Sequence, residues 1–253
     1  MAKSNSDQIN IVIPMSGEGK SFIQAGYTFP KPLIDINGKP MVQIVLENLT
    51  PKYKHKFILV CKKEHFDKYS MHQVFVNSIK GDFITIPLIS STQGALCSVL
   101  NAVDQISSNQ ELVIANADQI IDIDINKFID FARKSKADGV IMTFKSHHPR
   151  WSYARVDEKG IILETAEKKV ISDQATVGIY YFKAGSSFMK AAFSMIEKNI
   201  RFNNDFYVCP VYNELILEGK KIIKWEIKDV QMHGLGTPED LNSYLNLASK
   251  KRK

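Results

Sequence analysis

Continuous apolar runs alternate along the chain with segments in which apolar residues recur every three or four positions. Phe57–Cys61 is an uninterrupted apolar run, as expected of a strand that is buried on both faces. Met41–Leu49 has the spacing of one helical face, with a proline near each end. Alternating strand and helix signals are typical of a parallel sheet covered by helices. The pattern therefore predicts an α/β protein, with a hairpin formed by Trp151–Asp157 and Ile161–Glu167 in its second half.

Further segments complete the expected order of elements. The other expected strands cover about residues 10–15, 83–89, 111–117, 139–144, 175–182 and 222–227, and the other expected helices cover 64–77, 95–105, 125–135, 186–199, a segment ending near 218, and 237–249. A length of 253 residues suits one large α/β domain or two small ones. Because no internal repeat or low-complexity linker interrupts the pattern, we expect a single domain over residues 1–253.

The first expected strand leads into a glycine-rich turn with the properties of an anion-binding loop. In the stretch Asn10-Ile-Val-Ile-Pro-Met-Ser-Gly-Glu-Gly-Lys-Ser-Phe22, Gly17 and Gly19 allow backbone N–H groups to approach an anion closely. Lys20, together with Lys31 of the F-P-K-P-L sequence that follows, would add positive charge around the same anion. A phosphate-bearing ligand is therefore expected at the end of this strand.

The same turn ends like a P-loop, whose pattern is G-x-x-x-x-G-K-[ST]. The first glycine of that pattern would fall on Pro14. A P-loop lysine also opens a helix that faces the phosphates. Gly26, Pro30 and Pro32 follow Lys20 closely and are expected to prevent a helix there. The sequence therefore disfavours a P-loop.

Taken as a strand, G-x-G-x-R and an extended arm to F-P-K-P-L, residues 10–33 resemble the signature of the sugar-1-phosphate nucleotidyltransferases, or nucleoside-diphosphate-sugar pyrophosphorylases. Ser21 stands where that family has arginine, with Lys20 one place earlier. The resemblance extends over about residues 9–245. It implies a single three-layer α/β/α domain with a mixed, mainly parallel sheet, a Rossmann-like and GT-A-like nucleotidyltransferase fold. Its nucleotide-binding part would cover about 9–125, its acceptor-binding part about 138–230, and a C-terminal helix 237–249.

The resemblance also implies which residues bind the nucleotide. The phosphates would lie on the first loop, and Ser91-Thr-Gln-Gly-Ala95 resembles the family segment beside the nucleobase. The implied nucleotide-binding residues are Met15, Ser16, Gly17, Gly19, Gln93 and Gly94, with Lys20 and Lys31 as catalytic cations. A glycine turn that caps a helix explains Gln93 and Gly94 equally well.

One carboxylate is implied as the ligand of a catalytic Mg²⁺. Asp118 follows a buried strand, and ligands collect at the carboxyl ends of strands in open α/β sheets. Although a lone aspartate there usually caps a turn, Asn116-Ala-Asp-Gln119 resembles the metal-binding context of the family. Gly234 replaces the family's second aspartate, so tight metal binding would need another carboxylate such as Asp229. Asp122-Ile-Asp124 spells the D-x-D of glycosyltransferases, but its position favours a helix cap.

Later motifs resemble those that bind the phosphorylated acceptor. Glu167-Lys168 resembles the family's E-K-P element, with Lys169 in place of proline. Gly178 belongs to a strand that resembles the floor of the acceptor pocket. Asp205 lies in a segment resembling the family's acidic segment beside the acceptor, and a helix N-cap is its alternative role.

Charge and cysteine content narrow the classes of partner. The net charge is +6, but Lys250–Lys253 carry four positive charges and the rest of the chain is close to neutral. We expect that run to be a frayed tail and predict no nucleic-acid partner. No apolar run approaches the length of about 18 residues that a membrane-spanning helix needs, and the N-terminus lacks a secretory signal. Three dispersed cysteines fit buried thiols of a reduced, cytoplasmic protein. Whether the chain forms a homo-oligomer stays open.

The activity implied by the resemblance is transfer of a nucleotidyl group from an NTP to a small phosphorylated acceptor, with release of pyrophosphate. A sugar phosphate is the expected acceptor, and surface-polysaccharide precursor synthesis is the expected context. An acceptor phosphate is already ionised near neutral pH and needs no general base. Loss of the family arginine and second aspartate keeps a non-catalytic binding protein open, and a glycosyltransferase of similar architecture is a further alternative.

Overall fold

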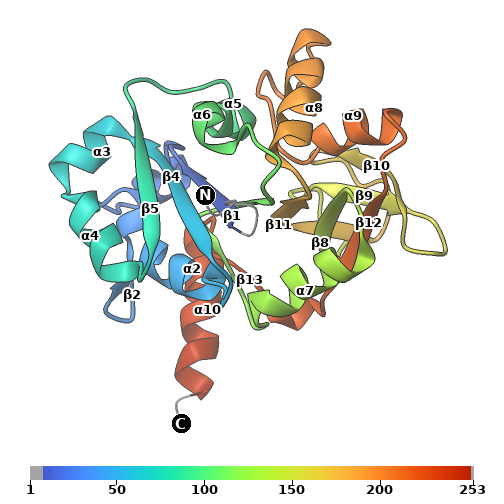
Figure 1. Ribbon diagram of the computed structural model, residues 1–253. Helices are drawn as coiled ribbons and strands as arrows, with labels where there is room; N and C mark the ends of the chain where they lie inside the picture. Colours follow the sequence, from blue (N-terminus) through green and yellow to red (C-terminus); the bar gives the residue numbers. More distant parts are fainter. Residues whose placement is uncertain (1–7, 252–253) are drawn as a thin grey trace.

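A mixed sheet of nine strands forms the centre of the molecule (Figure 1). The computed structural model describes residues 8–251. The strands follow the order β10-β9-β11-β6-β1-β4-β5, with β8 paired to β11 and β12 paired to β8. Their bounds are β1 (Ile9–Met15), β4 (His55–Lys62), β5 (Asp82–Leu88), β6 (Leu112–Ala115), β8 (Gly139–Lys145), β9 (Tyr153–Val156), β10 (Ile162–Ala166), β11 (Gln174–Phe182) and β12 (Ile222–Glu226). The predicted α/β class and the predicted hairpin are confirmed.

The strand directions divide the sheet into two parts. β1 pairs in parallel with β4 and β6, and β4 pairs in parallel with β5. β11 runs antiparallel to β6 and β8, whereas β12 runs parallel to β8. All nine residues of β11 are buried, as expected of a strand covered on both faces. β11 therefore joins the part expected to bind the nucleotide to the part expected to bind the acceptor.

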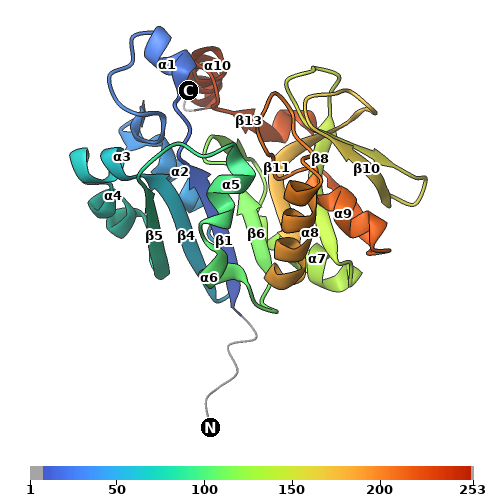
Figure 2. The ribbon, with the colours of Figure 1, turned by 90° about the horizontal axis from the view of Figure 1, so that it is seen from above.

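Helices cover both faces of this sheet. Their bounds are α1 (Lys20–Gln24), α2 (Met41–Leu49), α3 (Lys63–Lys68), α4 (Met71–Ser78), α5 (Ala95–Leu100), α6 (Val103–Ile106), α7 (Ile125–Ser135), α8 (Gly185–Glu197), α9 (Val211–Leu217) and α10 (Pro238–Lys251), with 3₁₀ turns η1 (Lys31–Leu33) and η2 (Asp229–Gln231). In Figure 2, α5, α6 and α8 lie in front of the strands. Their side chains share one core cluster with β4, β6 and β11, while α2, α4 and α7 contribute to the cluster on the other face.

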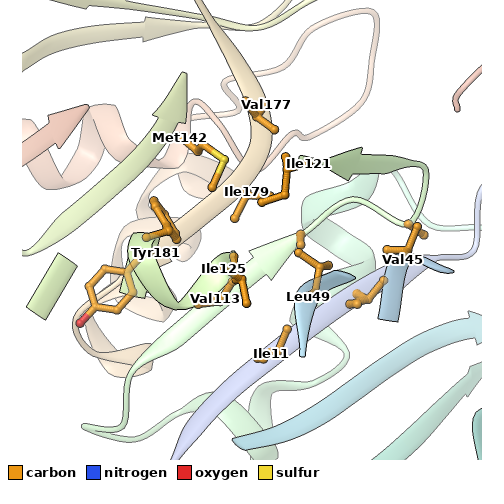
Figure 3. Close-up of a cluster of buried hydrophobic side chains, with 14 of the residues drawn as sticks. Ile11, Val45, Leu49, Val113, Ile121, Ile125, Met142, Val177, Ile179 and Tyr181 are labelled. Atoms are coloured by element: carbon orange, nitrogen blue, oxygen red, sulfur yellow. The ribbon is translucent and has the colours of Figure 1, made fainter. Parts of the chain in front are cut away.

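Alternating strand residues build these two core clusters. Ile11 and Ile13 of β1 belong to the cluster with α2, whereas Val12 belongs to the cluster with α5. Figure 3 shows part of the first cluster, where side chains of β1, α2, β6, α7, β8 and β11 gather. The labelled residues are Ile11, Val45, Leu49, Val113, Ile121, Ile125, Met142, Val177, Ile179 and Tyr181.

A third cluster attaches the C-terminal helix to the first loop. Two short strand pairs lie outside the main sheet, β2 (Asp35–Ile36) with β3 (Lys39–Pro40), and β7 (Gln119–Ile121) with β13 (Met232–Gly234). The buried members of the third cluster are Phe22, Ile34, Ile36, Met41, Ile120, Leu235 and Leu241. These residues come from α1, the arm after it, α2, β7, the segment after β13, and α10, so the C-terminal helix packs against the arm that follows the first loop.

The structure corrects three expectations about helices. A helix does form after Gly19: α1 has five residues, and Gly26 with φ 84° follows it, so one turn fits before the chain breakers act. The helix expected over 64–77 is divided at Ser70, which has φ 49°. The helix expected over 95–105 is divided where the amides of Asn101 and Ala102 bond three residues back, a tightening typical of helix ends.

Other local expectations are met in part. Thr237 Oγ1 accepts a hydrogen bond from the Asp240 amide (3.2 Å) and so caps the start of α10. α10 continues to Lys251, so the basic tail is helical up to that residue. Arg252 and Lys253 lie outside the described residues, as do residues 1–7.

Cys61 and Cys209 are buried as expected, but Cys97 is half-buried. Within residues 8–251, no helix is both long and apolar enough to cross a membrane.

Candidate active site

One cavity lies where the carboxyl ends of β1 and β6 meet the part of the sheet that is expected to bind the acceptor. Its volume is about 720 Å³. Segments far apart in the chain line it: the first loop, the turn before α5, the turn after β6, β11, and the segments around 150, 167, 205 and 236. Ligands of open α/β sheets collect at such an edge. The cavity is large enough for a nucleotide and a second small molecule, since ligand sites commonly occupy about 300–1,000 Å³.

The first loop places most of its predicted residues in the cavity wall. Met15, Ser16, Gly17 and Lys20 line the cavity. Gly19 is not part of the lining, but its φ of 64° is left-handed, and a Cβ there would lie 3.3 Å from Lys31 Cβ. Glycine therefore permits the turn that brings the F-P-K-P-L arm beside the loop.

Glu18 fastens this loop to the turn before α5. Its carboxylate accepts hydrogen bonds from Lys62 Nζ and from Ser91 Oγ, the latter at 3.1 Å. These two hydrogen bonds lower the pKa of Glu18, because they favour the charged carboxylate. The loop expected to hold phosphates is thus positioned by an acid whose charge is compensated by Lys62.

In the turn before α5, the side chain that faces the cavity is not the one that was predicted. Gly94 lines the cavity and is the N-cap of α5, as the helix-capping alternative expects. The side chain of Gln93 is exposed and outside the lining, and its Oε1 accepts a hydrogen bond from Arg201 (2.9 Å). Thr92 lines the cavity instead, with Oγ1 2.7 Å from Ser98 Oγ. Sequence reasoning missed Thr92 because residues of one turn do not show which of them points inward.

This turn is also hydrogen-bonded to Phe206, in the part of the chain that is expected to bind the acceptor. The amide of Phe206 donates to the Gln93 carbonyl (2.8 Å), and the amide of Leu96 donates to the Phe206 carbonyl (3.0 Å). Gly94 has φ 100°, and a Cβ there would lie 2.4 Å from the Phe206 oxygen. Only glycine can occupy this position without displacing the backbone of residue 206.

Asp118 and Lys31, which were predicted as separate site residues, both line the cavity and form an ion pair there. Asp118 lies between β6 and β7, and Lys31 lies in η1. Lys31 Nζ is 2.6 Å from Asp118 Oδ2, and both side chains are about one quarter exposed. This charge-assisted hydrogen bond holds the arm that carries Lys31 against the turn after β6.

The donor set around Asp118 fits a hard divalent cation. The amide of Leu235 donates to the Asp118 carbonyl (2.7 Å), and a Cβ at Gly236 would lie 3.2 Å from Asp118 Oδ2. The side-chain space beside the carboxylate is thus kept free by a glycine. Carboxylate oxygens suit Mg²⁺, which is usually held by one or two carboxylates plus substrate phosphates. No group of three or more His, Cys, Asp or Glu able to hold a metal occurs within the part of the chain that the structure describes.

The predicted alternative carboxylate is elsewhere. Asp229 is exposed in η2 and does not line the cavity, so it cannot compensate for Gly234. Asp124 accepts from the Asn126 amide (2.9 Å) and caps α7, as predicted, and the D-x-D does not reach the cavity. Asp240, by contrast, lines the cavity: a Cβ at Gly234 would lie 3.7 Å from its Oδ2.

All four predicted acceptor residues line the cavity: Glu167, Lys168, Gly178 and Asp205. Ser152 Oγ donates to Glu167 Oε2 (2.5 Å). Burial raises the pKa of Glu167, while Ser152 and the charge of Lys168 act in the opposite direction. Lys168 Nζ donates to the Tyr207 hydroxyl (3.2 Å). The helix-cap alternative for Asp205 is wrong, because Pro210 is the N-cap of α9.

Gly178 allows polar side chains to reach the floor of the cavity. It has φ 87°, and a Cβ there would lie 2.3 Å from Asn116 Nδ2 and 2.6 Å from Gln119 Oε1. Gln119 is buried and lines the cavity, and its Nε2 has no hydrogen-bond partner. Because a buried polar group without a partner is costly, this amide is available to a bound ligand.

Comparison with known proteins decides the family. The family model described as nucleotidyl transferase matches residues 11–212 of the chain. The chain belongs to the nucleotidyl transferase family. The matched range includes the first loop, the Asp118 turn and the segments of Glu167, Gly178 and Asp205.

Individual relatives of this nucleotidyl transferase are distant. It is 25% identical to the bifunctional protein GlmU of Methanocaldococcus jannaschii over 94% of the chain and 54% of that relative. It is 26% identical to the mannose-1-phosphate guanylyltransferase catalytic subunit beta of Drosophila pseudoobscura pseudoobscura over 68% of the chain and 47% of that relative. The chain thus spans about half the length of these curated relatives.

The fold of the nucleotidyl transferase also occurs in solved structures. The nucleoside-diphosphate-sugar pyrophosphorylase of Vibrio cholerae superposes with a TM-score of 0.77 at 21% identity, covering 93% of this chain and 99% of that one. At this identity the likeness concerns the fold, and it confirms the predicted mixed-sheet nucleotidyltransferase architecture.

Proposed function

We propose that the chain transfers a nucleotidyl group from an NTP to a small phosphorylated acceptor, a sugar phosphate, and releases pyrophosphate. The observation that carries the proposal is the single cavity in which the glycine loop and its lysines face the acceptor segments around Glu167, Gly178 and Asp205. Such a cavity brings two phosphorylated molecules together. Membership of the nucleotidyl transferase family supports the reaction class.

The first loop and two lysines would bind the triphosphate. Lys20 lines the cavity beside Gly17, and Lys31 Nζ is held at Asp118. In-line attack of the acceptor phosphate on the α-phosphorus concentrates negative charge on the pyrophosphate that leaves. Fixed cations and loop amides stabilise that charge without reorganisation, which is how electrostatic catalysis lowers a barrier. Alignment of the two anions by the opposite walls of the cavity supplies the rest.

Mg²⁺ is the proposed cofactor, and Asp118 would hold it together with phosphate oxygens. When bound, the ion neutralises charge on the phosphates during transfer. Lys31 neutralises the Asp118 carboxylate when no cation is present, because the two side chains form a close ion pair. The chain's own groups therefore keep this part of the cavity close to neutral.

The acceptor wall favours a polyhydroxylated phosphate. Glu167 offers carboxylate oxygens, and Gln119 Nε2 is a buried donor without a partner. Trp151 and Tyr207 add aromatic surface to the same wall. A sugar presents hydroxyl groups together with apolar C–H faces, so it matches this mixture of groups. Lys168, which lines the cavity, would bind the acceptor phosphate. A nucleotide sugar made here would serve glycosyl transfer, as in surface-polysaccharide synthesis.

Pyrophosphate release tests this proposal. The protein is incubated with Mg²⁺ and each of CTP, UTP, TTP, ATP and GTP, paired with a panel of sugar 1-phosphates and other small phosphorylated acceptors. We expect acceptor-dependent release of pyrophosphate for one pairing, and loss of most turnover in Asp118→Asn. The exposed Asp104→Asn in α6 is the matched control and should leave the rate unchanged.

Two other outcomes would contradict the proposal. Nucleotide binding without turnover for every acceptor would indicate a non-catalytic relative, consistent with the serine at position 21. Release of a nucleoside diphosphate from nucleotide sugars would indicate a glycosyltransferase. Each outcome is a different measured product, so the assay separates the three functions.

A further inference from the structure

We infer that Asp240 is the second carboxylate of the divalent-cation site, acting in the space that Gly234 leaves open. The inference rests on the proposed function and adds to it a residue that the sequence motif does not provide. Its basis is the position of the Asp240 carboxylate against the segment Gly234–Gly236, together with Asp118 against the same segment.

The space beside Gly234 is bounded by two side chains. A Cβ at this position would lie 3.5 Å from Trp151 Cη2 and 3.7 Å from Asp240 Oδ2, both ordinary contact distances. Gly234 is thus not a glycine required by crowding. The space that a side chain at position 234 would enter is bounded by Asp240 Oδ2, which belongs to α10.

Asp118, which precedes β7, also lies against the segment Gly234–Gly236. A Cβ at Gly236 would lie 3.2 Å from Asp118 Oδ2. Leu235, between the two glycines, is fully buried in the third core cluster. Gly234 and Gly236, on either side of Leu235, both line the cavity. The two carboxylates therefore flank one glycine-lined wall.

The Asp240 side chain is held in a defined orientation. Its amide donates to Thr237 Oγ1, so it belongs to the first turn of α10. Its Oδ1 accepts from Arg150 Nη1 (2.9 Å), and the Arg150 guanidinium lies 4.3 Å from the centre of the Trp151 ring. The Asp240 side chain is only 17% exposed. One oxygen is thus fixed by arginine, and the other faces Gly234.

Charge compensation follows the same rule at both carboxylates. Asp118 is paired with Lys31, and Asp240 is paired with Arg150. Both acids are neutralised by the chain itself, so neither creates a strong site for a free cation. A cation that arrives with the nucleotide brings phosphate oxygens as further ligands. It would displace Lys31 from Asp118 Oδ2 and bind Asp240 through Oδ2, the oxygen that Arg150 does not hold. Asp240 would thereby bind the cation mainly in the nucleotide complex.

A purely structural role makes a different prediction. If Asp240 serves only to anchor Arg150, removal of either partner breaks the same ion pair and has the same effect. If Asp240 is a ligand, removal of the carboxylate weakens cation binding, whereas removal of Arg150 leaves the carboxylate in place without its competitor. The two variants Asp240→Asn and Arg150→Gln therefore separate the explanations.

Mn²⁺ is the probe, because its electron paramagnetic resonance signal reports the free ion directly. Titrations are made on the full chain alone and with the non-hydrolysable α,β-methylene analogue of the preferred NTP. We expect Asp240→Asn to raise the Kd for Mn²⁺ in the nucleotide complex by at least about tenfold. Glu239→Gln, an exposed acid one position earlier, should leave the Kd unchanged. Arg150→Gln should leave it unchanged or lower it.

A relocation variant completes the design. Gly234→Asp has room for its Cβ and should restore Mn²⁺ binding in the Asp240→Asn background, and it should lower the Kd in the parent if Asp240→Asn does not fold. An unchanged Kd in Asp240→Asn would overturn the inference, as would equal weakening by Arg150→Gln. A parent that binds no Mn²⁺ would overturn it too. If the parent binds Mn²⁺ but no nucleotide, the proposed function fails, while the same variants still decide the ligand.

Discussion

Lys20 is the cation that the chain places directly beside its glycine loop. It lines the cavity, and the residue after it is Ser21. We expect Lys20→Ala to lower kcat by on the order of 10²–10³, the usual cost of removing a group that stabilises transition-state charge. The measurement is the initial rate of pyrophosphate release at saturating NTP. Lys80→Ala, an exposed lysine outside the cavity wall, is the control and should retain the parent rate.

Ser21→Arg tests whether the position or the charge matters. In the Lys20→Ala background it returns a cation to the neighbouring position, so we expect most of the lost rate to return. A lysine is a point charge, whereas arginine binds phosphate oxygens in a two-pronged manner. If Lys20→Ala turns over like the parent, Lys20 is only a solvated loop residue and the assignment is wrong.

Single residues of this site were predictable where the chain carries them next to a strand end. Asp118 and the first loop follow buried strands, so their place at the cavity could be expected from the sequence. Gln93 and Asp229 lie outside the cavity wall, because the orientation of one side chain in a turn is set by tertiary partners. Gln93 is held by Arg201, and Asp240 enters through packing of α10, contacts that no local pattern shows.

The turn before α5 is an element whose backbone cannot accept a side chain. At Gly94 a Cβ would lie 2.4 Å and 2.7 Å from backbone atoms of Phe206, and φ is 100°. We expect Gly94→Ala to lower the free energy of unfolding by at least about 2 kcal/mol, through strain and displacement of a buried backbone. Urea denaturation followed by circular dichroism measures it.

Gly17→Ala is the matched control for that element. No atom lies within 4 Å of a Cβ at Gly17. Its free energy of unfolding should stay within about 0.5 kcal/mol of the parent value. Equal destabilisation by the two substitutions would show that the approach of Phe206 to this turn is not what requires glycine.

Elements with strong periodicity were predicted well, and their interruptions were not. The buried strands and α7 with its Asp124 cap follow from apolar spacing and capping chemistry. The breaks at Ser70 and at Asn101 have no proline or glycine to announce them. α1 was not predicted, because Gly26, Pro30 and Pro32 were expected to prevent a helix anywhere after Lys20. One helical turn nevertheless fits before Gly26.

At the scale of the whole molecule, α10 stabilises the arm that carries Lys31. Leu241 is 1% exposed and packs in the cluster with Phe22 and Ile34, whereas Leu247 on the same helix is 48% exposed. We expect Leu241→Ala to cost about 2–5 kcal/mol of stability, because it removes a buried side chain and leaves a cavity. Thermal and urea unfolding provide the measurement.

The comparison within one helix isolates burial from helix propensity. Leu247→Ala makes the same chemical change at an exposed position and should change stability by no more than about 0.5 kcal/mol. If both variants lose the same amount, the third core cluster does not stabilise the arm. The α/β class and the sheet strands were predictable from sequence, but the pairing of β7 with β13 was not, since such short strands carry little pattern.

The hydrogen bonds between the turn before α5 and Phe206 also limit which chimeras of this protein with its relatives can fold correctly. The segment around Asp205, proposed to bind the acceptor, and the turn around Gly94 are far apart in the sequence but are joined by two backbone hydrogen bonds. A chimera with its crossover point between these two segments would take the turn from one parent protein and the segment that is hydrogen-bonded to it from another. Productive chimeras should therefore inherit both segments from the same parent, so this nucleotidyl transferase is less modular than its two-part sheet suggests.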